Sequence, residues 1–477
     1  MTIQRSPTSR VRLGVARTEI TPPVGIYHRM WGAARHDRST GVHRPLVGDV
    51  LAFGALAGNS VDLIRVYLDG VGLAQPQHNE LARILAEAGG VPLERVIITY
   101  SHTHSGGVFY PDRIPLPGGE LIPAYLAQLG ERLATACRQA VAAFQPVVIT
   151  YAIGRCDLAA NRDYWDDAFN GHVCGFNPDV PADDTVLVAR VTDSDRRLLA
   201  TIVNYACHPT TLAWDNTLIS PDYVGAMREE VEKATEAPCV FAQGACGDLG
   251  PRHGFVGDPA IADQNGRQLG YAALSALTSL GPPATDFHYR GPVISGATVG
   301  VWAHAPFDAT RQAETSHFVG GSYTVELPLK PRPEPAALRA EMERWEAQQK
   351  DADAQGDAIA ARDYGARAER ARRWLGRLAV LPSGSTFPFP YSVYRLGDAV
   401  WVTTGGEPYN LLQTSLRRQF PGRTIIVSPL AGAGAAAYLL PRDRYGKGLY
   451  QEEPSILAPG CLETLIETIA ERIAALE

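Results

Sequence analysis

Two histidines stand where a strand-like run ends. Val96 to Tyr100 is apolar and β-branched, and Ser101-His102-Thr103-His104-Ser105-Gly106-Gly107 follows it. Side chains two residues apart on a strand share a face and lie about 6.6 Å apart at 3.3 Å per residue. His102 and His104 could therefore bind one metal ion together, or one could bind it while the other contacts a substrate. The two glycines would let a ligand approach the backbone.

A third histidine, His208, also follows a strand-like run, Asn204-Tyr205-Ala206-Cys207. Ligands of open α/β sheets collect at the carboxyl ends of the strands. We therefore expect His102, His104 and His208 to meet at one site. Alternation sends Cys207 to the opposite face, where we expect a buried thiol.

Two glycine-containing segments could complete such a site. Residues 243–252 follow an apolar run, and their backbone N–H groups could face an anion or a developing oxyanion. Thr403-Thr404-Gly405-Gly406-Glu407 ends another run, and about thirty residues later comes a Gly- and Ala-rich stretch, 431–438. Glu407 could bind a metal, act as a general base, or cap a helix beginning after Pro408. The chain contains no GxSxG, GxGxxG or P-loop pattern.

The elements that position these residues predict an α/β fold with mixed β-sheets covered by helices. Many of the apolar runs are β-branched and nearly uninterrupted, which is typical of strands covered on both faces. We expect helices over 79–89 and 122–144, where apolar residues recur every three or four positions. Strands are expected over 50–54, 61–68, 96–100, 147–153, 185–191, 199–206, 399–404 and 424–428.

We expect residues 10–477 to form a single large catalytic domain, with 331–378 inserted in it as a helical hairpin. This segment is rich in Ala, Arg, Glu and Gln, and Pro331, Pro333 and Pro335 open it. Its spaced apolar residues indicate two helices packed on each other and laid on the body. A lid over a site and a contact in a homo-oligomer are the alternatives.

Composition excludes several classes of protein. The 477 residues carry 44 Lys and Arg against 51 Asp and Glu, a net charge of −7, which offers no basic field for nucleic acid. The sequence has no run of 18 apolar residues, so we expect no membrane span. The polar start and the seven cysteines without a CxxC pair lead us to expect a cytoplasmic protein with reduced thiols and a small-molecule substrate.

Taken together, the motifs resemble the catalytic domain of the neutral/alkaline ceramidases. The resemblance runs in order from about residue 12 to 460, and six short motifs in order are fairly specific. They are Gly14-Val15-Ala16-Arg17-Thr18-Glu19-Ile20-Thr21-Pro22-Pro23, Ser101 to Gly107, Asn161-Arg162, the strand into His208, Gly247-Asp248 and Glu407.

The resemblance implies a zinc amidase that cleaves an N-acyl bond. It implies that His102 and His208 are zinc ligands, together with the Glu407 carboxylate and the Tyr438 phenol. It also implies that His104 contacts the reacting carbonyl and that Arg162 is a substrate-site arginine. Such a site would activate a water molecule as the nucleophile.

The chain departs from the family after Asp248. Gly250 stands where the ceramidases have a serine, and Arg252 where they have an asparagine. We expect Asp248, Gly250 and Arg252 to contact the substrate, and Arg252 to favour a small polar or anionic compound over long-chain ceramide. Because the sequence ends at Glu477, we also expect no counterpart of the family's immunoglobulin-like domain.

Our leading hypothesis is therefore a zinc-dependent hydrolase of an amide bond. The alternatives are an esterase or lactonase using the same zinc site, and a non-catalytic protein that binds zinc and a ligand. A serine hydrolase using Ser101 or Ser105 is the least favoured hypothesis, because no nucleophile elbow supports it.

Overall fold

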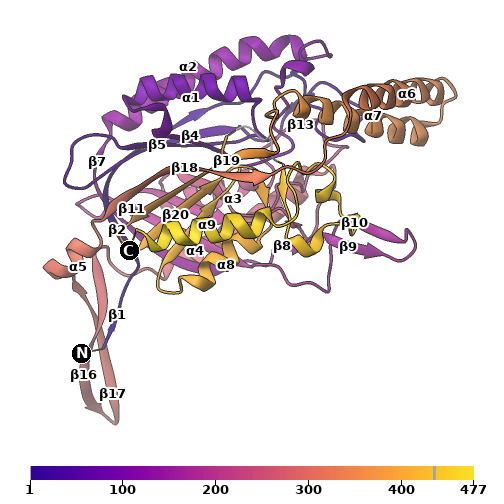
Figure 1. The fold of residues 1–477 in the computed structure, drawn as a ribbon. Coiled ribbons are helices and arrows are strands. Elements are labelled where there is room, and N and C mark those ends of the chain that lie inside the picture. The colour runs from indigo at the N-terminus through magenta and orange to yellow at the C-terminus, as the bar shows by residue number, and fades with distance from the viewer. Residues whose placement is uncertain (1, 433–436, 477) are drawn as a thin grey trace.

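Two β-sheets packed face to face form the centre of the protein (Figure 1). The structure is a computed structural model that describes residues 2–432 and 437–476. The larger sheet has the strand order β14-β12-β11-β7-β2-β4-β5-β6. Its strands are β2 (Thr8–Glu19), β4 (Val47–Gly54), β5 (Leu63–Leu68), β6 (Val96–Tyr100), β7 (Gln145–Arg155), β11 (Thr185–Thr192), β12 (Leu198–Tyr205) and β14 (Cys239–Gln243).

The smaller sheet has the order β18-β19-β20-β22. Its side chains interdigitate with those of the larger sheet; Phe53 and Trp401, for example, meet edge to face with ring centres 5.7 Å apart. Its strands are β18 (Phe318–Pro328), β19 (Thr386–Leu396), β20 (Ala399–Thr404) and β22 (Thr424–Ser428).

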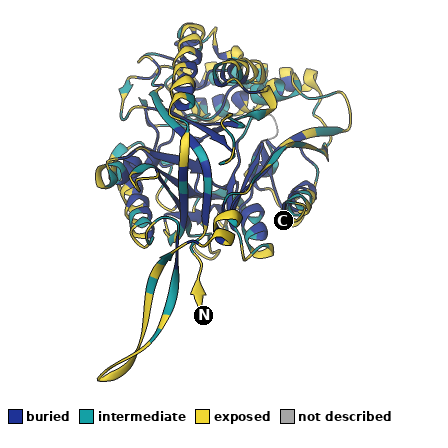
Figure 2. Ribbon diagram, turned by 90° about the vertical axis from the view of Figure 1, so that its left-hand side faces the viewer, coloured by how far each residue is buried: buried dark blue, intermediate teal, exposed yellow. Residues whose placement is uncertain are grey.

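Helices cover the outer faces of both sheets, as the buried residues in Figure 2 illustrate. Val50 and Ala52 of β4 face the helices, whereas Leu51 and Phe53 face the second sheet. Burial on both faces explains why the strand sequences are nearly uninterrupted apolar runs. The helices are α1 (Gln75–Gly89) and α2 (Ile122–Ala142) over one half of the larger sheet, α3 (Tyr223–Thr235) and α4 (Pro259–Thr278) over the other half, and α8 (Leu411–Gln419) and α9 (Cys461–Ala474) over the smaller sheet.

The predicted α/β class is confirmed, and every run predicted as a strand or helix overlaps one in the structure. No helix in the described parts of the chain is long and apolar enough to cross a membrane. All seven cysteines are free thiols, as predicted, and Cys207 is fully buried.

Parallel strand pairs bring the chemical motifs to one place. β5 pairs with β6, β12 with β14 and β20 with β22 in parallel, while the other neighbours in these two sheets run antiparallel. The edge strands β6 and β14 of the larger sheet also lie next to each other, so the sheet is strongly curled. The carboxyl ends of β6, β12, β14 and β20 therefore carry the four segments singled out in the sequence.

A three-stranded arm projects from the body (Figures 1 and 2). It consists of β1 (Ile3–Gln4), β16 (Thr285–Ser295) and β17 (Ala297–Pro306), and Ile294 near its tip is 85% exposed. The remaining elements are short: β3 (Gly41–Val42), β8 (Ala159–Asn161), β9 (Asp163–Asp166), β10 (Gly171–Cys174), β13 (Leu218–Ile219), β15 (Leu249–Pro251), α5 (Ala309–Glu314), β21 (Glu407–Pro408) and β23 (Tyr438–Leu439).

The segment predicted as a helical hairpin contains two packed helices, α6 (Pro335–Ala354) and α7 (Ala358–Leu378), which lie side by side in Figure 1. The rings of Trp345 and Tyr364 stack 5.6 Å apart between them. Glu369 of α7 anchors the pair to the body by accepting two hydrogen bonds, of 2.9 and 2.7 Å, from the buried guanidinium of Arg113. That the hairpin is an insertion in a single catalytic domain stays a prediction.

Glu369→Gln should loosen the attachment of α7 to the body. The substitution leaves the buried Arg113 without its carboxylate, which typically costs about 3 kcal/mol or more. We expect hydrogen exchange of the buried α7 amides at pH 7 to accelerate roughly a hundredfold, measured by mass spectrometry. The matched control is Glu343→Gln on α6, an exposed residue for which no change is expected.

The same residue predicts a pH dependence. Burial raises the pKa of the Glu369 carboxyl, but Arg373 and Arg113 outweigh this effect and lower it to about 2. This value lies below the roughly 4.3 of an unfolded glutamate, so the ionised form stabilises docking above about pH 4.3 and the stabilisation is lost as the pH falls toward 2. Identical corrected exchange rates in wild type and Glu369→Gln across this range would contradict the assignment.

Candidate metal centre

His102, His104 and His208 meet at one site, as the sequence predicted. Their ring centres lie 4.9 Å apart for His102 and His104, 5.0 Å for His102 and His208, and 6.0 Å for His104 and His208. One ring nitrogen from each falls in a group whose members all lie within 4.8 Å of one another. Three imidazoles at this separation are a recurrent zinc-binding set.

The reason given for the convergence of His102 and His104 was wrong. β6 ends at Tyr100, and His102 adopts a left-handed backbone conformation with φ of 71°. The pair is therefore not set by side-chain alternation along a strand. A turn brings the rings together, and the His102 N–H donates to the Gly70 carbonyl to hold that turn.

Backbone carbonyls fix the orientation of two of the imidazoles. His208 Nδ1 lies 2.7 Å from the Cys246 carbonyl oxygen, and His102 Nδ1 lies 3.2 Å from that of Val71. A carbonyl only accepts hydrogen bonds, so Nδ1 carries the proton in each ring and Nε2 presents its lone pair. This is how metal-binding histidines are commonly oriented.

The Glu407 carboxylate faces both of these lone pairs. Its Oε2 lies 3.0 Å from Nε2 of His208 and 3.4 Å from Nε2 of His102. Two lone-pair acceptors at such a distance repel each other unless a proton or a metal ion lies between them. Ligands at 2.0–2.1 Å from a tetrahedral Zn²⁺ are about 3.3 Å apart, so the three residues fit a metal ion.

Strand pairing rather than helix capping holds Glu407. β21 runs parallel to β23, which sets Glu407 beside Tyr438, and α8 begins only at Leu411. Of the roles left open by the sequence, capping a helix after Pro408 is therefore not supported. The carboxylate points at the histidines instead.

The electrostatic environment keeps the imidazoles of His104 and His208 neutral. Burial, assisted by Arg162, lowers the pKa of His208 to about 4, and burial lowers the pKa of His104 well below its usual value. Neutral imidazoles and an ionised carboxylate are the forms that bind zinc.

Tyr438 and Arg162 lie beside the cluster and contact each other. Arg162 Nη2 donates to the Tyr438 hydroxyl at 3.0 Å and to the Gly247 carbonyl at 2.7 Å. The Tyr438 ring stacks against His208 with centres 6.2 Å apart. Burial raises the pKa of the Tyr438 hydroxyl well above its usual value despite Arg162. Metal binding by Tyr438 and substrate binding by Arg162 stay predictions.

The glycine-containing segment 243–252 does not offer its backbone as the sequence suggested. The N–H groups of Gly244, Gly247 and Leu249 donate to the carbonyls of Tyr205, Pro408 and Cys246. That of Ala245 donates to the Gln413 side chain at 3.0 Å. These four amides stabilise the turn itself and are not available to an oxyanion. The Gly- and Ala-rich segment near Tyr438 lies partly at 433–436, outside the described residues.

Asp248 and Gly250 flank Arg162. The Arg162 N–H donates to the Asp248 carbonyl at 3.0 Å, and the Asp248 carboxylate accepts from the Asn410 N–H at 2.7 Å. A Cβ added at Gly250 would lie 3.7 Å from Arg162 Cδ and 3.8 Å from Thr210 Oγ1, which is ordinary contact. The buried Thr210 hydroxyl has no hydrogen-bond partner within the described residues, and the sequence gave no signal for it.

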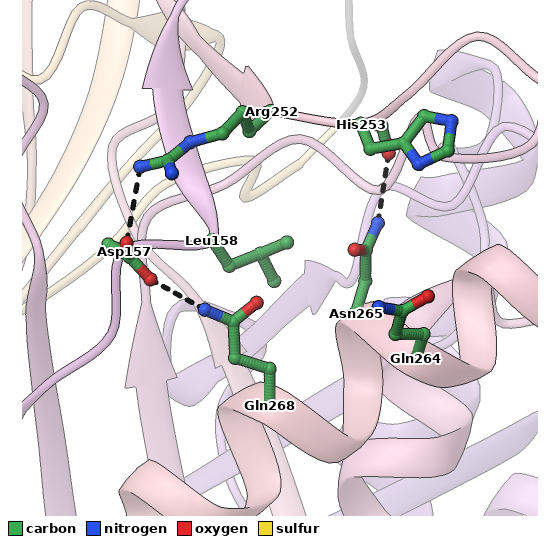
Figure 3. Close-up of a pocket in the computed structure, with 7 residues that line it drawn as sticks. All are labelled: Asp157, Leu158, Arg252, His253, Gln264, Asn265 and Gln268. Carbon is green, nitrogen blue, oxygen red and sulfur yellow. Dashed lines mark hydrogen bonds and ion pairs between the residues drawn. The ribbon is translucent and has the colours of Figure 1, made fainter.

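Arg252 is the predicted site residue that lies apart from the cluster. Its side chain is 53% exposed, and its guanidinium pairs with Asp157 at 3.2 Å (Figure 3). The two residues line a surface pocket of about 230 Å³ together with Gln268 and others. No interaction described for Arg252 involves His102, His208 or Glu407. Its contact with a substrate stays a prediction.

An aromatic wall beside His104 was missed by sequence reasoning. Trp31 lies 5.2 Å from the His104 ring, and Trp214 and Phe255 lie 6.2 and 5.7 Å from Trp31. All three aromatic residues are partly exposed, and His104 Nε2 has no hydrogen-bond partner among the described residues. Single aromatic residues far apart in the chain carry no local signal, so only the fold reveals this wall.

Comparison with known proteins finds similarity at the level of structure. No family model and no curated protein matches the sequence significantly. The solved structure of neutral ceramidase from Pseudomonas aeruginosa aligns with a TM-score of 0.65 at 18% identity, covering 99% of this chain and 75% of that chain. A ceramidase complexed with C2 aligns with a TM-score of 0.63 at 17% identity, with the same coverage. The chain therefore has the fold of the neutral ceramidases.

Proposed function

We propose that this protein is a zinc-dependent hydrolase that cleaves the amide bond of a small, polar or anionic N-acyl compound. The observation that carries the proposal is the pair of Nε2 lone pairs facing the Glu407 carboxylate, an arrangement that requires a cation. The ceramidase fold over 99% of the chain supports an amide as the bond that is cleaved. An ester or lactone at the same centre is the alternative, because activated water attacks either carbonyl.

The protein residues divide the work between them. When bound, zinc would supply a water of lowered pKa and polarise the scissile carbonyl. His102, His208 and Glu407 would hold the metal, with Tyr438 as a fourth candidate ligand. His104, whose Nε2 is unpaired, would stabilise the developing oxyanion or pass a proton to the leaving amine.

The surroundings favour particular substrate parts. The partly exposed rings of Trp31, Trp214 and Phe255 next to His104 would pack against an acyl chain or ring of the substrate. Gly250 offers no hydroxyl, so a serine-dependent step at that position is not part of the proposal. Arg162 would hold the Tyr438 hydroxyl in place and present its guanidinium at the edge of the site.

His102→Ala and His208→Ala should each abolish both zinc binding and hydrolysis, because each removes one of the two oriented Nε2 ligands. Zinc is measured by mass spectrometry of the purified protein, and hydrolysis by screening N-acyl amides, esters and lactones with and without a chelator. His317→Ala, which alters an exposed histidine, is the matched control. Full zinc occupancy in either variant would exclude that histidine as a ligand.

His104→Ala should keep zinc but lose turnover by about 10²- to 10⁴-fold, which is the usual contribution of a positioned acid or base. The expected readouts are an unchanged zinc content and a fall in kcat. Loss of zinc in this variant would instead show that all three histidines bind the metal, as their mutual distances allow.

Arg252→Ala tests whether this residue binds the substrate. If it does, KM should rise about tenfold or more, since a hydrogen bond to a charged group contributes about 1.5–3 kcal/mol. Asp157→Asn, which removes the negative charge paired with Arg252, should then lower KM for an anionic substrate. An unchanged KM in both variants would show that the Arg252–Asp157 pair is structural.

A further inference from the structure

Helix α7 reaches the loop that packs on His104. Arg373 donates a hydrogen bond to the Met30 carbonyl, and the Cβ position of Gly32 lies only 3.1 Å from Ala366 of α7. The residue between these two contact points is Trp31, whose ring lies 5.2 Å from the His104 ring. The hairpin is therefore attached directly to one wall of the candidate metal centre.

Two tyrosines connect the carboxyl-terminal half of α7 with Glu407. The Tyr450 ring lies 5.9 Å from that of Tyr438 and is 49% exposed, so it lies at an open edge of the site. Arg373 and Glu407 are both electrostatic neighbours of Tyr450. Arg373, Arg377 and Glu407 are likewise electrostatic neighbours of Tyr110. The tyrosines thus lie within electrostatic reach of both the α7 arginines and the metal-centre carboxylate.

Three guanidinium groups, those of Arg113, Arg372 and Arg373, share Glu369 at this end of α7. Arg372 also pairs with Glu346 at 2.6 Å, and Arg113 with Asp112 at 3.5 Å. The guanidinium of Arg377, one helical turn after Arg373, forms no ion pair or hydrogen bond with any described residue. Its described contact is with the Trp374 ring, 5.6 Å away.

Glu453 is a carboxylate near Arg377, but it does not form an ion pair with it. Glu453 accepts a hydrogen bond from Trp374 Nε1 at 2.7 Å and lies 3.8 Å from Arg370, and it is near Arg377 without forming an ion pair with it. Burial, and after it Arg373, lowers the pKa of Arg377. A partly desolvated guanidinium beside another cation is stabilised by an anion.

We propose that Arg377, with Arg373 beside it, forms an anion subsite that binds a carboxylate or phosphate group of the substrate while the scissile bond lies at the histidine cluster. The inference rests on the proposed function and names its substrate class: an acyl compound with an apolar part for the aromatic wall and an anionic group for α7. Arg377 is a substrate-binding residue in this view.

Binding to the zinc-free protein tests the subsite without requiring turnover. The probes are two matched pairs: N-octanoylglycine with N-octanoylglycinamide, and N-octanoylethanolamine phosphate with N-octanoylethanolamine. Calorimetry should show that wild type binds the charged member of at least one pair tenfold or more tightly than the neutral member. The pair with the larger preference identifies the anion as carboxylate or phosphate.

Variants of α7 test whether Arg377 causes the preference for the charged probe. Arg377→Ala should remove the preference and leave the affinity for the neutral member unchanged, whereas Arg377→Lys should retain part of it, since lysine keeps the charge but not the fork of donors. Arg362→Ala, an exposed arginine on the same helix about 22 Å away along its axis, is the matched control. If Arg377→Ala fails to fold, the comparison of Arg377→Lys with wild type carries the test.

The outcomes separate this inference from the proposed function. A charge preference that depends on Arg377, in a protein that hydrolyses no amide when loaded with zinc, would support the subsite and contradict the amidase. Hydrolysis of N-octanoylglycine and its amide with equal KM, unchanged by Arg377→Ala, would support the amidase and overturn the subsite. Failure of wild type to prefer either charged probe would also overturn the subsite.

Discussion

The Glu407 carboxylate faces the lone pairs of two imidazoles, and the rest of the site depends on how the repulsion between them is relieved. Both Nδ1 atoms are committed to backbone carbonyls, so neither Nε2 can donate a proton to the carboxylate in the neutral ring. Protonation of His208 would relieve the repulsion, but burial disfavours the protonated ring. A metal ion relieves it without charging the imidazoles, and the 3.0 and 3.4 Å separations suit ligands of one ion.

This arrangement needs long-range structure to hold it. His102, His208 and Glu407 follow three strands from two sheets, and the sheets must pack face to face for the strand ends to converge. The double burial of these strands is therefore a requirement of the site as well as of the core. It also explains why the carbonyls that orient the histidines come from residues next to other strand ends, such as Cys246 after β14.

The sequence predicted the parts of this arrangement that depend on local pattern. Uninterrupted β-branched runs predicted the strands, and the rule that ligands collect at strand ends predicted that His102, His104 and His208 would meet. The backbone at His102 could not be predicted, because a left-handed conformation is uncommon for any residue other than glycine and a histidine is only a weak signal of it. The paired amides of residues 243–252 were missed for a related reason: their acceptors, such as Pro408, are distant in the chain.

The difference between local pattern and distant contacts also explains why the sequence predicted Arg252 as the cation of the site, whereas the structure leads us to propose Arg377 of α7. Arg252 adjoins a recognisable motif, but a neighbour in sequence at a strand end can point away from the site, and its guanidinium pairs with Asp157 at the surface. Arg377 adjoins no motif and lies in a helix whose composition is that of an ordinary amphipathic hairpin. Glu369 and Met30 attach that hairpin beside the metal centre, so in the proposed subsite the hairpin's attachment and the site's selectivity would depend on the same contacts.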